Sequence, residues 1–304
     1  MKRLVSIIIG LALVLPLLAQ EPTAQEPTEQ QEVVYTPQQG EWAIGFTLNP
    51  ILNFVGNMFN GTAGQIFDSQ SLGGQPLATN ADPTYPLISI MGKYMVRDNV
   101  AIRANIGLLL NVNNQNYYVP DDKAVLLDPL SVEKVTDKKY SETYGGSLFI
   151  GAEYRVGKKR VQGIFGGGLN YAFSVYQAKY SYGNAISEAN QTPTMGEGMP
   201  AFTQPVVYMP NARTFSQLSS GTHTVGLVGN IGVECFVAPK ISLGLEANLA
   251  ILYRVERPSY KQLEGYNLIT KEVQNYTDIA DKSASGFVFG TQNVGANIFM
   301  NFYF

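Results

Sequence analysis

The stretch ISLGLEANLAILY, residues 241–253, decides the fold, because apolar residues alternate in it with small or polar ones. Successive side chains of a β-strand point to opposite faces, so a period of two predicts a strand with one apolar and one polar face. The polar face carries Ser242, Gly244, Glu246 and Asn248. The apolar face carries Ile241, Leu243, Leu245, Ala247, Leu249, Ile251 and Tyr253.

The same alternation recurs in seven further segments of the chain. They lie within residues 42–48, 88–94, 102–112, 144–154, 165–173, 225–233 and 298–304. Several of these segments run to about ten residues, which suits tilted membrane strands better than the shorter strands of soluble domains. A soluble sandwich would also alternate, but its outer face would not be this rich in Gly, Ser and Asn.

The connections between the segments alternate between short and long. The short ones are 97–99, 157–160 and 238–240, and the long ones are about 50–84, 113–139, 177–222 and 257–284. Short turns at one end and long loops at the other are typical of bacterial outer-membrane barrels. The sequence therefore predicts an all-β protein, a transmembrane antiparallel up-and-down β-barrel of eight strands, with ten strands left open.

Composition excludes several other classes of protein. Only 15% of the 304 residues are charged, against about 25% in an ordinary soluble domain. One Cys and one His allow neither a disulfide framework nor a Cys/His zinc site, and we expect no metal and no cofactor. A net charge of −3 does not suit a nucleic-acid partner.

The N-terminus has the order of a secretory signal. Lys2 and Arg3 precede the apolar run 4–18, and the small residue Ala19 follows. The run is shorter than the roughly 20 residues that a membrane-spanning helix needs. We expect a cleaved signal peptide at 1–19 and an outer-membrane barrel at 41–304. We expect residues 20–40 to form a disordered periplasmic arm, because they hold two EPT repeats and little that could be buried.

Aromatic residues on the apolar faces fall into two groups by depth, as expected for girdles that contact the membrane lipid at both interfaces. The group near the short turns is Trp42, Tyr94, Tyr154, Phe302 and Phe304. The group toward the long loops is Tyr144, Tyr171, Phe173 and Tyr253.

Together with the signal peptide and the eight segments, the C-terminal NIFMNFYF, residues 297–304, resembles a known family. The chain is similar to small bacterial outer-membrane β-barrels of the OmpA/OmpX type, in the form found in Bacteroidota. The resemblance implies that the final strand, ending in Phe304, is presented to the barrel-assembly machinery. It covers about residues 41–304 and is one of architecture.

Six charged residues on the polar faces lie at similar distances from the short turns. They are Lys93, Arg103, Glu153, Arg155, Glu234 and Glu246. Three positive and three negative groups at one depth predict a buried ion-pair network that fills the barrel, because an eight-stranded barrel is wide enough only for its own side chains. An ion gate or a proton path is the alternative that we weigh against lumen filling.

Catalysis has little support in the sequence. Lipid A deacylases of similar architecture place a His and a Ser two residues apart, but here Val225 stands two residues after His223. The remaining hypothesis is a non-enzymatic outer-membrane protein whose loops or arm contact a partner protein of the envelope, as an accessory subunit or a surface protein. A small-solute pore is the alternative, and a lipid-modifying enzyme is a weaker one. Met195, Met199 and Met209 in the longest loop would either contact such a partner or fold over the barrel mouth.

Overall fold

The computed structural model describes residues 34–48, 89–219, 221–279 and 283–304. The expected signal peptide, most of the expected arm and the whole of the first long connection, 50–84, lie outside these residues. No helix in the described part of the chain is long and apolar enough to cross a membrane.

The described residues contain eleven strands and one short helix. The strands are β1 (Trp42–Thr47), β2 (Ser89–Arg97), β3 (Val100–Pro120), β4 (Lys134–Lys158), β5 (Val161–Ser181), β6 (Ala212–Ser219), β7 (Thr222–Ala238), β8 (Ile241–Glu256), β9 (Ser259–Asn267), β10 (Glu272–Ile279) and β11 (Ala284–Tyr303). The helix is α3 (Asp122–Leu127), between β3 and β4.

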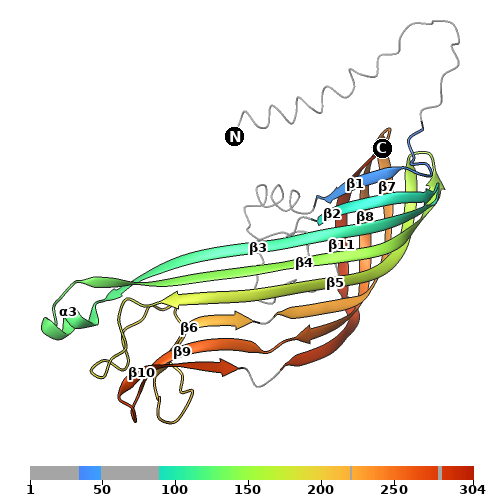
Figure 1. Ribbon diagram of the computed structural model, residues 1–304. Coiled ribbons are helices and arrows are strands. Elements are labelled where there is room, and N and C mark those ends of the chain that lie inside the picture. The colour runs from blue at the N-terminus through green and yellow to red at the C-terminus, as the bar shows by residue number, and fades with distance from the viewer. Residues whose placement is uncertain (1–33, 49–88, 220, 280–282) are drawn as a thin grey trace, which may run out of the picture. The chain divides into compact units, whose positions relative to one another are not determined.

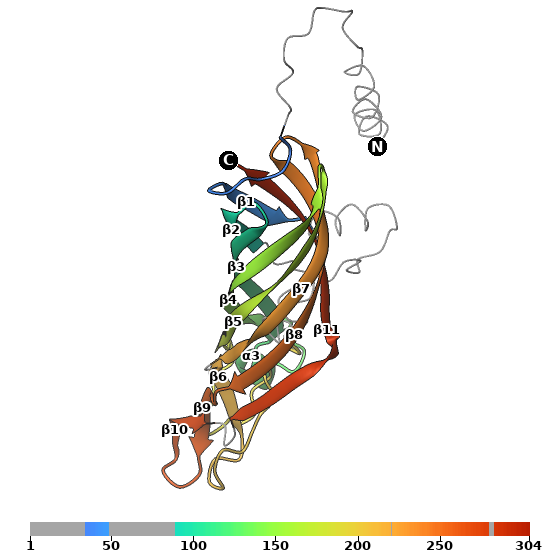
Figure 2. The same ribbon diagram turned by 90° about the vertical axis from the view of Figure 1, so that its right-hand side faces the viewer.

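Eight of these strands close into a ring in which every neighbouring pair is antiparallel (Figures 1 and 2). The order around the ring is β1, β2, β3, β4, β5, β7, β8 and β11, and β11 pairs again with β1. These are the eight strands that the alternation predicts. The three short connections are the predicted turns, and we call this end of the barrel the turn end and the opposite one the loop end.

Exposure shows which face of the ring is apolar. Leu243, Leu245 and Leu249 on β8 are 36%, 56% and 43% exposed, whereas Glu246 on the same strand is buried. The same division runs along β3, where Leu108 is exposed and Arg103 is buried. A ring with apolar side chains outside and charged ones inside is a transmembrane β-barrel, the inverse of a soluble one.

Three of the predicted long loops contain further regular structure. β3 and β4 continue past the ring as far as α3, and β6, β9 and β10 extend the sheet beside β5 in the order β5, β6, β9, β10. The prediction of loops at 113–139, 177–222 and 257–284 was therefore wrong in part. Both faces of these strands are largely polar, so the alternation that reveals the ring strands is absent from them.

The chain bends at two points where the ring ends, between β6 and β7 and between β8 and β9 (Figure 1). Gly221 adopts a φ of +102° between β6 and β7, a conformation that side chains other than glycine's rarely adopt. The N–H of Arg257, between β8 and β9, donates to the carbonyl oxygen of Gly221 at 3.0 Å. The two bends are thus held together, and β6 and β9 continue as a pair beyond them.

The last residues of the expected arm are held at the turn end. Tyr35 packs against the buried cluster that includes Met95, and its ring lies 4.0 Å from the guanidinium of Arg160. Gly40 N–H donates to Met95 O at 2.8 Å, and Lys240 Nζ donates to Thr36 O at 3.3 Å. Residues 34–40, which the sequence analysis places in the arm, are therefore packed against the turns, because an aromatic ring and several backbone groups in this segment find partners there.

Replacement of Gly244 by Ala tests the packing inside the ring. A Cβ atom at residue 244 would overlap the ring of Phe299, which is fully buried with Met91 and Ile164. Overpacking of this kind is expected to reduce the free energy of unfolding by about 1–3 kcal/mol, measured by urea unfolding in lipid vesicles. Gly92→Ala is the matched control, since its new Cβ would lie 3.9 Å from the nearest atom, Ala104 O. Equal losses in both variants would contradict the packing.

Candidate functional site: the barrel interior

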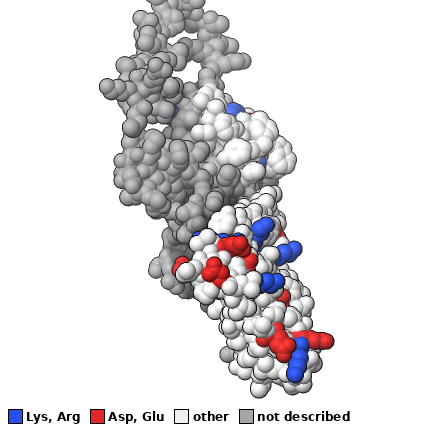
Figure 3. Space-filling model, turned by 90° about the vertical axis from the view of Figure 1, so that its left-hand side faces the viewer, with Lys and Arg blue, Asp and Glu red and all other residues white. Residues whose placement is uncertain are grey.

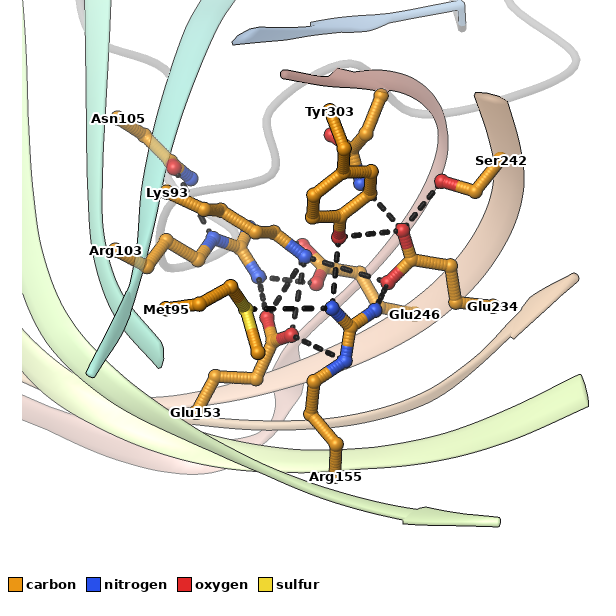
Figure 4. Close-up of polar contacts among 11 residues, drawn as sticks. Lys93, Met95, Arg103, Asn105, Glu153, Arg155, Glu234, Ser242, Glu246 and Tyr303 are labelled. Atoms are coloured by element: carbon orange, nitrogen blue, oxygen red, sulfur yellow. Dashed lines mark hydrogen bonds and ion pairs between the residues drawn. The ribbon is translucent and has the colours of Figure 1, made fainter. Parts of the chain in front are cut away.

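The barrel interior brings together all six charged residues of the predicted network (Figure 4). They come from five strands: Lys93 from β2, Arg103 from β3, Glu153 and Arg155 from β4, Glu234 from β7 and Glu246 from β8. Their side chains are at most 4% exposed. Three cations and three carboxylates therefore balance within one buried layer.

The contacts join the six residues into one network. Lys93 Nζ lies 3.1 Å and 2.9 Å from the two carboxylate oxygens of Glu153, and 3.6 Å from Glu234. Arg103 donates to Glu246 through both terminal nitrogens, at 2.6 Å and 2.7 Å, and its Nη1 lies 3.8 Å from a carboxylate oxygen of Glu153. Arg155 donates to Glu234, and its Nε lies 3.6 Å from Glu153. Because every charge faces an opposite one, the cost of burying it is offset in place.

Neutral side chains that the sequence analysis did not select complete the network. Glu234 accepts from Ser242, from Asn301 Nδ2 at 2.8 Å and from the Tyr303 hydroxyl at 2.9 Å. Arg155 donates to the same hydroxyl at 2.8 Å. Ser242, Asn301 and Tyr303 all lie on the polar phase of their strands, which is the signal that could have identified them.

Each cation of the network also lies over an aromatic ring. Lys93 Nζ is 5.1 Å from the centre of the Phe299 ring, and the Arg103 guanidinium is 5.7 Å from that of Phe149. The guanidinium of Arg155 is 5.8 Å from the Phe236 ring and 5.4 Å from the Tyr303 ring. Such contacts stabilise a desolvated cation and also fill the space beside it. The three phenylalanines occupy the inward phase, where the alternation alone predicts polar residues.

Three apolar clusters connect strands from different sides of the ring. Toward the turn end the cluster is Ala43, Met95, Ala101, Phe236 and Tyr303. At the level of the ion pairs it is Met91, Ile164 and Phe299, and toward the loop end it is Phe149, Val228, Ala250 and Leu252. The charged layer thus lies between apolar layers, and side chains fill the interior at all three levels.

The nine predicted girdle residues all lie on the outer face, and none of them is buried. Near the turn end, the centre of the Trp42 ring lies 4.6 Å from that of the Tyr94 ring. The backbone N–H of Trp42 donates to the backbone carbonyl oxygen of Phe304 at 2.9 Å. Toward the loop end, Tyr171 stacks on Phe173 at 6.3 Å. The remaining members, Tyr154, Phe302, Tyr144 and Tyr253, are exposed.

Comparison with known proteins adds a structural similarity. No protein-family model and no curated protein matches the chain. Among solved structures, the chain is similar to the outer membrane protein OprG from Pseudomonas aeruginosa, with 12% sequence identity and a TM-score of 0.30 over 89% of this chain and 99% of OprG. At that score we base the fold on the strand pairing and the exposure of this chain alone.

His223 has a partner that does not suggest catalysis. Its Nδ1 atom lies 2.8 Å from the hydroxyl of Tyr171. The imidazole and the phenol ring stack on the outer face of the barrel near the loop end. In the described part of the chain, no three His, Cys, Asp or Glu side chains gather in a way that could hold a metal ion. Cys235 is exposed on the outer face of β7.

Replacing Glu234 by Gln tests the balance of charge in the network. The change leaves Lys93 and Arg155 short of one carboxylate, so the free energy of unfolding is expected to fall by about 3–5 kcal/mol. Glu256→Gln is the control, because Glu256 pairs with Arg254 at 2.6 Å but is 45% exposed. This variant should lose less than about 1 kcal/mol of the free energy of unfolding. Similar losses for both variants in denaturant titrations would show that the network does not act as a buried unit.

Proposed function

We propose that this protein is a non-enzymatic outer-membrane barrel with a closed interior, whose extended sheet and loops contact partner proteins outside the cell. The observation that carries the proposal is the filled interior: a charge-balanced network enclosed between apolar clusters. A protein built in this way offers solutes no water-filled path, so its activity has to lie on its surfaces.

The exposed surface of the ring supports the location. The outer face carries Leu, Ile and Val between two rows of aromatic residues, which is the pattern of a barrel in contact with lipid and its two interfaces. With the N-terminal signal pattern, the outer membrane is the fitting compartment, and the turn end faces the periplasm. Assembly through the C-terminal strand, an OmpA/OmpX-type relationship and an origin in Bacteroidota remain part of the proposal.

Hydrogen bonds to a buried carboxylate hold the part of the sheet beyond the ring together, which supports a role in recognition. The buried Asp137 on β4 accepts from the N–H groups of Gly183 at 2.9 Å and Gly196 at 3.0 Å. These bonds hold the 182–211 connection against the extended sheet. Met199 and Met209 are buried, so the sequence-based idea that they contact a partner is wrong for these two residues. They stabilise the loop that would present other surfaces.

Conductance measurements separate this function from a small-solute pore. The purified protein in planar lipid bilayers is expected to give no stable conductance, because side chains cross the ring at three levels. Arg103→Ala combined with Glu246→Ala removes one ion pair without changing the net charge, and it should stay non-conducting while Met91, Phe149 and Phe299 remain. A stable conductance of the unchanged protein would contradict the proposal and favour the pore.

Mass spectrometry of lipid A tests the absence of enzymatic activity. Cells that produce the protein and cells that produce His223→Ala are expected to contain the same lipid A species as cells without either, because the described partner of His223 is the Tyr171 phenol. A modification that depends on His223 would overturn the non-enzymatic proposal.

A further inference from the structure

The β3–β4 connection presents four large apolar side chains to solvent. Leu126 and Leu127 end α3, and Leu130 and Val132 follow in the turn that leads to β4; we call these four residues the apolar tip. Their exposed fractions lie between 81% and 89%. Single exposed apolar residues are ordinary on protein surfaces, but a group of this size in an ordered segment marks an interaction site.

Hydrogen bonds fix the backbone of the connection that carries the tip. Asp121 caps α3 by accepting from Lys123 N–H at 2.9 Å, and Asp128 accepts from Leu130 N–H at 3.0 Å. Asp121 N–H in turn donates to Glu133 O at 3.0 Å, which closes the base of the connection. An exposed apolar group that is already ordered loses little conformational entropy on binding.

A second set of contacts anchors the tip to the 182–211 connection. Asp122 accepts from Asn190 Nδ2 at 2.7 Å and Thr194 N–H at 2.9 Å, and its own N–H donates to Asn184 Oδ1 at 3.0 Å. Partial burial raises the pKa of Asp122, but the hydrogen bonds from Thr194 and Asn190 outweigh this, so the pKa lies below its ordinary 3.8. The carboxylate stays charged near neutral pH, and the anchor does not depend on pH there.

The position of the tip disfavours the protein's own membrane as its binding surface. The outward apolar row of β3 ends at Val112, and Pro120 lies eight residues farther along the same strand. At about 3.3 Å per residue, this separation along the strand is about 26 Å. The tip therefore lies at the far end of the β3–β4 hairpin, well past the last residue of that outward apolar row (Figure 1).

Charge around the tip narrows the kind of partner. Residues 121–134 hold the acids Asp121, Asp122, Asp128 and Glu133 and the bases Lys123 and Lys134, so their net charge is −2. Figure 3 shows this side of the molecule, where charged side chains lie among uncharged ones. Acidic groups beside the apolar tip disfavour binding to an anionic lipid surface. They favour binding to a protein pocket with basic groups at its rim.

We propose that the apolar tip is the docking surface of this protein and inserts into an apolar, basic-rimmed groove of a partner protein outside the cell. The inference rests on the proposed function, which requires an extracellular protein contact, and it assigns that contact to Leu126, Leu127, Leu130 and Val132. The extended β3 and β4 hold these side chains clear of the membrane, and α3 orders them before binding.

Site-specific crosslinking in intact cells tests the assignment. The photoreactive residue p-benzoylphenylalanine replaces Leu127 in the full chain, and the control replaces Ile269, which is 73% exposed in the turn between β9 and β10. A crosslink to one protein from residue 127 and none from residue 269 is expected. The crosslinked peptide of that protein should contain apolar residues flanked by Lys or Arg.

Binding of the purified proteins completes the test. Leu127→Asp is expected to weaken binding to the crosslinked protein at least about tenfold, since a charge would enter the groove. Ile269→Asp should leave the affinity unchanged, and raising the salt concentration should weaken binding, because charges contribute at the rim. Both variants must keep the heat-modifiable gel migration of a folded barrel, which shows that the exposed substitution has not disturbed folding.

The other outcomes distinguish the two proposals. A protein crosslink from residue 269 alone would overturn the tip as the docking surface and leave the proposed function standing. Crosslinks from neither residue would count against both. A crosslink from residue 127 to lipid or to a second copy of this chain would overturn the partner assignment. Equal effects of Leu127→Asp and Ile269→Asp on the binding affinity would overturn it as well.

Discussion

The structure depends on one constraint: backbone N–H and C=O groups in hydrocarbon have to find partners within the sheet. An open sheet would leave two edges unpaired, and closure through the β1–β11 pair removes them. Closure then dictates the two faces, since a ring of eight strands has lipid on its outside and a narrow space inside. The exposed leucines of β8 and the buried glutamate between them are both consequences of that geometry.

Much of the ring could be predicted from the sequence because lipid and lumen impose opposite demands on neighbouring residues. The alternation in 241–253 is clear for that reason, and it places Glu246 inside correctly. Phe149, Phe236 and Phe299 could not be assigned in the same way, because an inward phenylalanine looks like a break in the pattern. The positions of Phe149 and Phe299 depend on the inward glycines Gly151 and Gly244, where the missing Cβ leaves room for a ring.

Beyond the membrane the sequence signal fades for a physical reason. Polar residues outnumber apolar ones in the strands there, and no lipid demands an apolar outer face, so a period of two is no longer required. β6, β9 and β10 and the outer parts of β3 and β4 were accordingly predicted as loops. Asp137 and Asn184, which fix the 182–211 connection, gave no signal in the sequence, because a buried polar residue in a polar segment cannot be recognised without its partners. The signal for the apolar tip was present in the run AVLL at 124–127, but it belongs to no repeating pattern.

The continuity of β3 and β4 from the ring to α3 has a mechanical consequence. Every residue of β3 is paired with one of β4, from Val100 opposite Tyr154 to Pro120 opposite Lys134. A pull on α3 therefore draws β3 and β4 in the same direction as one hairpin, and the load falls as shear on the hydrogen bonds that join this hairpin to β2 and β5. The hairpin can transmit tension from its tip to the barrel wall without unravelling there.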